Sequence, residues 1–131
     1  MRLTLEMDTS RLIPFVQEFG HPLPWTTDDL PGLVVMRLDT LDGATAAYVW
    51  LHFDADDALA MTVHGTSRPE FRGRLWSPQV MNDVCALSRL MGATRMVARY
   101  ATPRRAAAWH RFFNRMVPCR LSGTYVIHEL Y

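Results

Sequence analysis

The sequence predicts an α+β (α/β) fold in a single domain over residues 1–131, with the element order β-α-β-β-β-α-β-α-β. Three observations lead to this prediction. Several short runs alternate apolar and polar residues or are rich in Val, Leu and Tyr, as strands are. Two segments begin with a hydroxyl side chain followed by proline and continue with apolar residues at helical spacing. Apolar residues make up 49% of the chain, which is enough for a hydrophobic core.

The first half of the chain is expected to contain one helix and four strands. The helix covers about residues 11–19, after capping candidates at 8–10, and ends at Gly20. Residues 21–32 are rich in proline, so we expect a loop in which Trp25 either covers the core or lines a pocket. The four strands are Arg2–Glu6, Leu33–Asp39, Ala44–Phe53 and Leu59–Ser67, with turns at Asp42-Gly43 and at the acidic residues 54–57.

The second helix follows a short basic segment. Arg72, Gly73 and Arg74 precede Ser77, which is a good N-cap, and a proline fills the first helical position. The helix then carries apolar residues at helical spacing up to Gly92, namely Val80, Met81, Val84, Leu87 and Met91. Backbone N–H groups and the positive end of the helix dipole point out of a helix N-terminus, so this start is suited to an anion.

The remaining elements are a strand, a third helix and a last strand. The strand covers Thr94–Tyr100, and Thr102 repeats the cap-plus-proline start for a helix over Arg104–Met116. The apolar stripe of that helix is formed by Ala106, Trp109, Phe113 and Met116. The last strand covers Thr124–Tyr131, directly after Gly123.

Charge is distributed unevenly along the chain. Residues 1–67 hold three arginines against ten acidic residues, a net charge of −7, whereas residues 68–131 hold eleven arginines against three, a net charge of +8. This asymmetry favours an anionic partner on one face, and neutralisation of one half by the other is the alternative. The two cysteines are unclustered, so we expect them to be reduced and the protein to be cytoplasmic. No apolar run approaches the roughly 18 residues of a membrane span.

Residues 68–74, RPEFRGR, closely resemble the "PEYRGRG" segment of the GNAT (GCN5-related N-acetyltransferase) superfamily. The resemblance implies a mixed, mostly antiparallel central sheet, with this segment joining the fourth strand to the helix that follows. It also implies that the segment binds the pyrophosphate of acetyl-CoA through its amides. The cofactor-binding residues would then be Arg72, Gly73, Arg74, Leu75, Trp76 and Ser77. The element order agrees with the family over about the whole chain, most clearly over residues 59–117.

Two stretches depart from the family pattern. Leu75 stands where the pattern has its second glycine, and Ser77 where it has Gly or Ala. A side chain at Leu75 is expected to hinder the approach of a phosphate, which indicates a degraded cofactor loop. In the third helix, Phe113 stands where the family commonly has its catalytic tyrosine, and Val117 replaces a glycine. No catalytic tyrosine is therefore evident at that position.

Acetyl transfer needs an amine stripped of its proton and an acid for the departing thiolate. Tyr100, at a strand end, is a candidate acid, with a rim tyrosine as the alternative interpretation. His64, on the strand beside the cofactor slot, and Glu70, just after that strand, are candidate bases, although both also suit structural roles. The histidines show no metal-ligand spacing, so no metal is expected.

Two functions remain open. The first is an acetyl-CoA-dependent N-acetyltransferase acting on an unknown amine. The second is a catalytically silent GNAT-fold protein that serves in an assembly, with a protein partner or further copies of itself. The latter would resemble the short GNAT-like proteins of tailed bacteriophages, some of which are virion components. Nucleic-acid binding is disfavoured because the arginine-rich half carries no base-reading motif.

Overall fold

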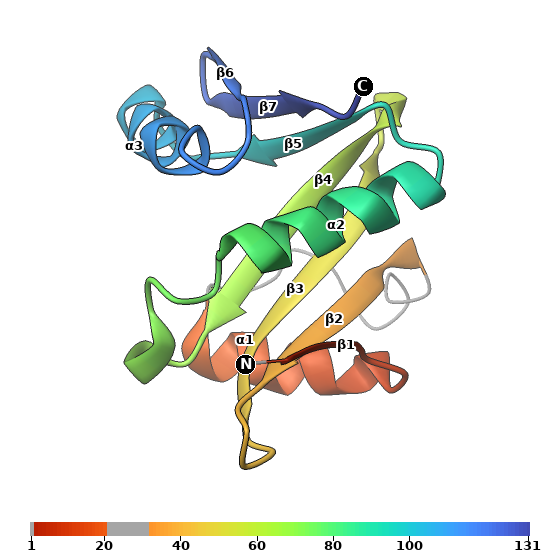
Figure 1. The fold of residues 1–131 in the computed structure, drawn as a ribbon, viewed down its shortest axis with the longest axis vertical. Coiled ribbons are helices and arrows are strands. Elements are labelled where there is room, and N and C mark those ends of the chain that lie inside the picture. Colours follow the sequence, from red (N-terminus) through yellow and green to blue (C-terminus); the bar gives the residue numbers. More distant parts are fainter. Residues whose placement is uncertain (1, 21–31) are drawn as a thin grey trace. The chain divides into compact units, whose positions relative to one another are not determined.

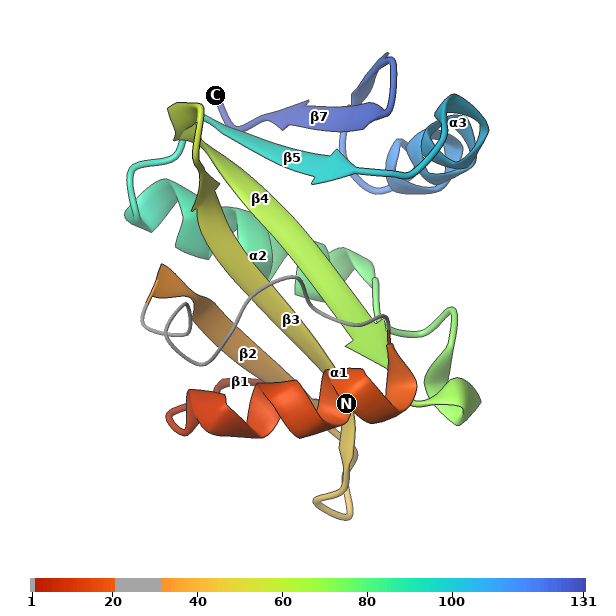
Figure 2. The ribbon, with the colours of Figure 1, turned by 180° about the vertical axis from the view of Figure 1, so that it is seen from behind.

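The computed structural model describes residues 2–20 and 32–131 (Figures 1 and 2). It contains three helices, α1 (Leu12–Phe19), α2 (Pro78–Leu90) and α3 (Pro103–Phe113). Its strands are β1 (Arg2–Leu5), β2 (Val34–Asp39), β3 (Thr45–Asp54), β4 (Asp57–Ser67), β5 (Arg95–Arg99), β6 (Arg120–Ser122) and β7 (Tyr125–Glu129). The loop prediction for residues 21–31, Trp25 included, lies outside the described residues.

The strands form one mixed sheet in the order β1-β2-β3-β4-β5-β7-β6. The pairs β1–β2, β2–β3, β5–β7 and β6–β7 are antiparallel, whereas β4–β5 is parallel. The predicted α+β class and mostly antiparallel sheet are therefore confirmed. One strand was missing from the prediction: β6 is three residues long and exposed throughout, so it has no apolar pattern to reveal it.

The residues divide into two compact units, which are described separately. Unit 1 comprises residues 1–52 and 64–75, and unit 2 comprises residues 53–63 and 76–131.

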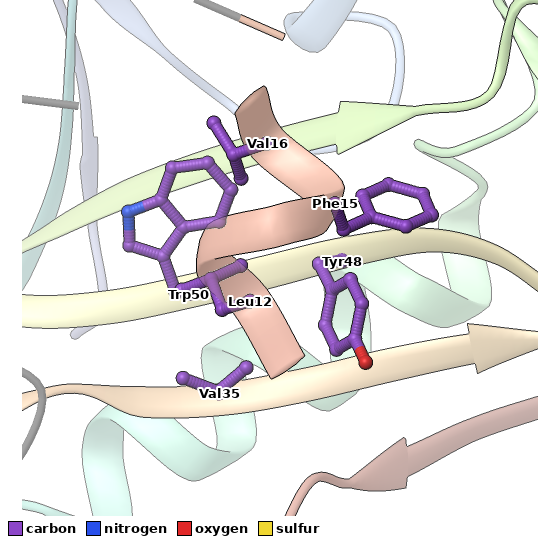
Figure 3. Close-up of a cluster of buried hydrophobic side chains, with 6 residues drawn as sticks. All are labelled: Leu12, Phe15, Val16, Val35, Tyr48 and Trp50. Carbon is purple, nitrogen blue, oxygen red and sulfur yellow. The ribbon is translucent and has the colours of Figure 1, made fainter. Parts of the chain in front are cut away.

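In unit 1, α1 covers one face of β2 and β3 (Figure 2). Leu12, Phe15 and Val16 on α1 form a buried cluster with Val35 on β2 and with Tyr48 and Trp50 on β3 (Figure 3). Phe15 meets the Tyr48 ring edge to face at 5.0 Å. The sequence forms this layer because apolar residues of α1 recur at helical spacing.

Unit 1 also contains a buried charged network. Glu6 is only 5% exposed and accepts hydrogen bonds from Arg37 at 2.5 Å and from the Tyr48 hydroxyl at 3.3 Å. Arg37 also donates from Nε to Asp39 at 2.9 Å, so its guanidinium is shared by two carboxylates. Burial and the neighbouring Glu6 charge raise the pKa of Tyr48 to about 12, so its hydroxyl stays protonated as a donor.

In unit 2, β5 lies between β4 and β7. It pairs with β7 along its whole length, but its parallel pairing with β4 covers only the three residue pairs from Ala60↔Arg95 to Thr62↔Val97. The backbone of the end of β5, at Ala98 and Arg99, is thus paired on the β7 side and has no ladder partner on β4.

In unit 2, specific contacts hold α2 against β5 and against the residue that follows β7. From α2, the Cys85 thiol lies 3.4 Å from the Met96 sulfur on β5, and Arg89 donates to the Leu130 carbonyl at 2.9 Å. The loop after α3 is held by two hydrogen bonds. The Asn114 side chain accepts from the Cys119 amide at 2.9 Å, and the His110 ring bonds the Cys119 carbonyl at 2.9 Å. Both cysteines are free thiols, and burial raises the pKa of Cys119 to about 11.

Candidate active site

The basic loop, residues Arg72–Ser77, lies between the short 3-10 turn Pro69–Phe71 and α2. Its conformation depends on Gly73, whose φ of +82° is in the left-handed region that favours glycine. The Arg72 amide donates to the Pro69 carbonyl and the Arg74 amide to the Phe71 carbonyl. Both arginine side chains are exposed, and neither forms an ion pair with any residue that the structure describes.

At the end of this loop, Ser77 caps α2 as predicted: its hydroxyl accepts a hydrogen bond from the Val80 amide at 3.2 Å. Pro78 occupies the first helical position. Trp76 is half-buried and meets the Phe113 ring edge to face at 5.6 Å.

Leu75 is buried in the structure, with 7% of its surface exposed. Its side chain therefore packs inside the protein rather than projecting from the loop into solvent. This placement speaks against the expectation that the side chain hinders a phosphate, because the hindrance requires it to stand on the outer side of the loop.

His64 on β4 is part of a histidine pair with His52 on β3. Their Nε2 atoms are 3.0 Å apart, and the His64 ring stacks on the Trp50 ring at a centroid distance of 5.4 Å and 12° between planes. Burial and, secondarily, the charge of His52 lower the pKa of His64 to about 4. His64 is therefore neutral at physiological pH, which is the state that a proton acceptor needs.

The other two candidates lie in different surroundings. Glu70 is exposed in the 3-10 turn, and nothing in the described residues pairs with its carboxylate. Tyr100 follows β5 in unit 2 and stacks on Trp109 at 5.8 Å, with burial raising the pKa of its hydroxyl. Phe113 is 7% exposed and packs against Trp109 and Phe112. A phenylalanine has no hydroxyl, so this position offers no acid.

His52 and Trp50 were not among the predicted site residues. Residues 48, 50 and 52 share one face of β3 by strand alternation, and that signal could have marked Trp50 and His52 as a pair. The residues that the structure describes include no group of three or more potential metal ligands and no helix long and apolar enough to cross a membrane.

Several solved structures have a similar fold. The GNAT domain of S. lividans PAT matches with a TM-score of 0.69 and 16% identity, over 98% of this chain and 89% of that one. A GCN5-related N-acetyltransferase from Kribbella flavida matches with a TM-score of 0.69 and 12% identity, over 98% and 96% of the chains. This is the GNAT fold.

A third GNAT-fold neighbour is a phosphinothricin acetyltransferase (Pat) of the GNAT superfamily from Sinorhizobium meliloti in complex with AcCoA. It matches with a TM-score of 0.66 and 14% identity, over 98% of this chain and 89% of that chain. No protein-family model matches the chain, and no curated protein matches it. The likeness to these solved structures is therefore one of fold, at sequence identities of 12% to 16%.

Proposed function

We propose that this GNAT-fold protein is an acetyl-CoA-dependent N-acetyltransferase whose basic loop holds the cofactor's pyrophosphate. The observation that carries the proposal is the loop itself. Arg72 and Arg74 are exposed and free of ion pairs among the described residues, and Gly73 turns the backbone at a φ of +82° just before a capped helix start. Exposed guanidiniums and a helix N-terminus are the groups that bind phosphates.

The backbone of the loop assigns the remaining contacts. The amides of Arg72 and Arg74 already bond within the loop, so we assign the amides of Gly73, Leu75 and Trp76 to the pyrophosphate. The burial of Leu75 supports this assignment because it directs the side chain inward.

The test is calorimetric titration with acetyl-CoA of the intact chain and of the variants Arg72→Ala and Arg74→Ala. A charge-assisted bond to phosphate is worth about 1.5–3 kcal/mol, so each variant should bind roughly 10- to 150-fold more weakly. Arg2→Ala is the matched control, because it removes an exposed arginine of β1 with the same change in charge. Equal affinities in all four proteins would refute the role of the loop.

Transfer is tested separately from binding, by thiol release from acetyl-CoA in the presence of spermidine, phenethylamine or Nα-acetyl-lysine. A protein that does not bind acetyl-CoA at millimolar concentration would instead favour the second alternative, in which the fold is kept for a surface. The buried Phe113, which stands in place of a tyrosine, favours this second alternative.

A further inference from the structure

The histidine pair is hydrogen-bonded edge to edge. The ring centroids are 5.1 Å apart and the planes differ by 16°, while the two Nε2 atoms are 3.0 Å apart. The difference between the two distances is roughly twice the distance from a ring's centre to its nitrogen, so the nitrogens point at one another. One nitrogen must then donate and the other accept, which means that a single proton bridges the pair.

Trp50 stacks against the His64 ring and holds it in its orientation. The indole is 4% exposed and is packed against Leu12 and Val16 of α1 (Figure 3). Because the His64 ring lies parallel to the indole, it is held in one plane and cannot turn its Nε2 away from His52 without losing this contact. A side chain held in this way is preorganised for proton transfer.

A half-buried histidine alone is a poor place to leave a positive charge. Burial lowers the pKa of His64 to about 4, and no carboxylate of the described residues hydrogen-bonds its ring. The charged and titratable groups of unit 1 on the neighbouring elements are engaged elsewhere or exposed: Arg37 with Glu6 and Asp39, Tyr48 with Glu6, Arg68 over Phe19, and Glu18 at the surface. Transfer of the bridging proton would move the positive charge from His64 to His52.

We propose that His52 and His64 work as one proton-transfer unit for the acceptor amine, with His64 accepting the proton and His52 carrying the resulting charge. The proposal rests on the proposed N-acetyltransferase function. It gives His52 a role as the residue that acts through His64, and it explains how a neutral, half-buried base can remove a proton from an amine.

An N–H bond of the bound ammonium breaks, its electron pair stays on the amine nitrogen, and the proton joins Nδ1 of His64. The bridging proton leaves Nε2 of His64 and joins Nε2 of His52, so that His52 becomes the imidazolium. Once the product leaves, the bridging proton returns to Nε2 of His64 and water takes the proton on Nδ1 of His64. Both rings then regain their starting tautomers, and the net result is transfer of one proton from the ammonium to water.

The experiment compares the wild-type chain with His52→Gln, His64→Gln and the double variant. His128→Gln is the matched control, because this histidine bonds the Pro118 carbonyl in unit 2 and lies outside the pair. Thiol release is measured against pH with the three amines named above. We expect His52→Gln to bind acetyl-CoA like the wild type but to lower the plateau of kcat at least tenfold.

Two further results decide the proposal. The double variant should be no slower than His64→Gln, since residues that act as a unit are not additive. Nitrogen-15 spectra of the histidine rings should show one shared proton between the two Nε2 atoms in the wild type. A His52→Gln variant with the wild-type plateau of kcat, additive losses, or no transfer to any amine by a protein that binds acetyl-CoA would each overturn the proposal. Failure to bind acetyl-CoA would overturn the proposed function instead.

Discussion

Replacing Leu75 by glycine restores the residue that the family pattern has in the basic loop, and the structure predicts that this change weakens the protein without improving binding. Leu75 is 7% exposed, so almost its whole side chain is removed from water. Truncating a buried leucine to alanine costs about 2–5 kcal/mol, and glycine adds about 0.5–1 kcal/mol through backbone freedom. The sum, about 3–6 kcal/mol, is a large part of the 5–15 kcal/mol that typically stabilises a domain.

The assay is urea unfolding, together with calorimetric titration of acetyl-CoA into each folded variant. Leu75→Ala separates the loss of the side chain from the gain in backbone freedom. Leu90→Ala is the surface control, because Leu90 is 85% exposed and should lose less than about 0.5 kcal/mol. The reasoning is refuted if Leu75→Gly binds acetyl-CoA more tightly than the wild type at an unchanged unfolding midpoint, because the side chain would then be an obstruction and not a core residue.

Two other predictions concern the charged groups of unit 1. Glu6→Gln should lower the free energy of unfolding by about 1.5–3 kcal/mol, because it removes the buried charged acceptor of Arg37 while Arg37 keeps its pairing with Asp39. Glu129→Gln, in the exposed pair with Arg120, should cost less than about 1 kcal/mol. Urea unfolding checks both, and equal losses would contradict the burial argument. In the folded protein the pKa of His64 is about 4, below its ordinary 6.5. Between these two pH values the unfolded chain binds more protons than the folded one. The free energy of unfolding should therefore fall as the pH drops from 7 to 4, by at most about 3 kcal/mol. His64→Gln should flatten this dependence and His128→Gln should keep it; a slope that survives in His64→Gln would assign the effect to other groups.

The parts of the fold that could be predicted are those with local signals. Ser77, Pro78 and Gly92 delimit α2 in the sequence as they do in the structure, because capping, the first helical position and the left-handed C-terminal glycine are decided by nearby backbone. Strand β6 could not be predicted, since its three exposed residues are held only by pairing with β7.

The candidate site divides in the same way. The basic loop is a contiguous stretch, so its residues could be named from the sequence. The burial of Leu75 depends on packing with distant segments, and a local comparison with a glycine position does not reveal it. The contact of His52 with His64 joins residues twelve positions apart on neighbouring strands, and it depends on a register that side-chain alternation alone leaves open.

The thiols described in the fold have a practical consequence for handling the protein. Cys85 is buried, and burial raises the pKa of both Cys85 and Cys119, the latter to about 11. The thiolate is the reactive species, so at pH 7–8 both native cysteines are slow to alkylate or oxidise. A new cysteine at an exposed position such as Leu41, which is 99% exposed, can therefore be labelled with a maleimide dye while the native thiols remain unmodified.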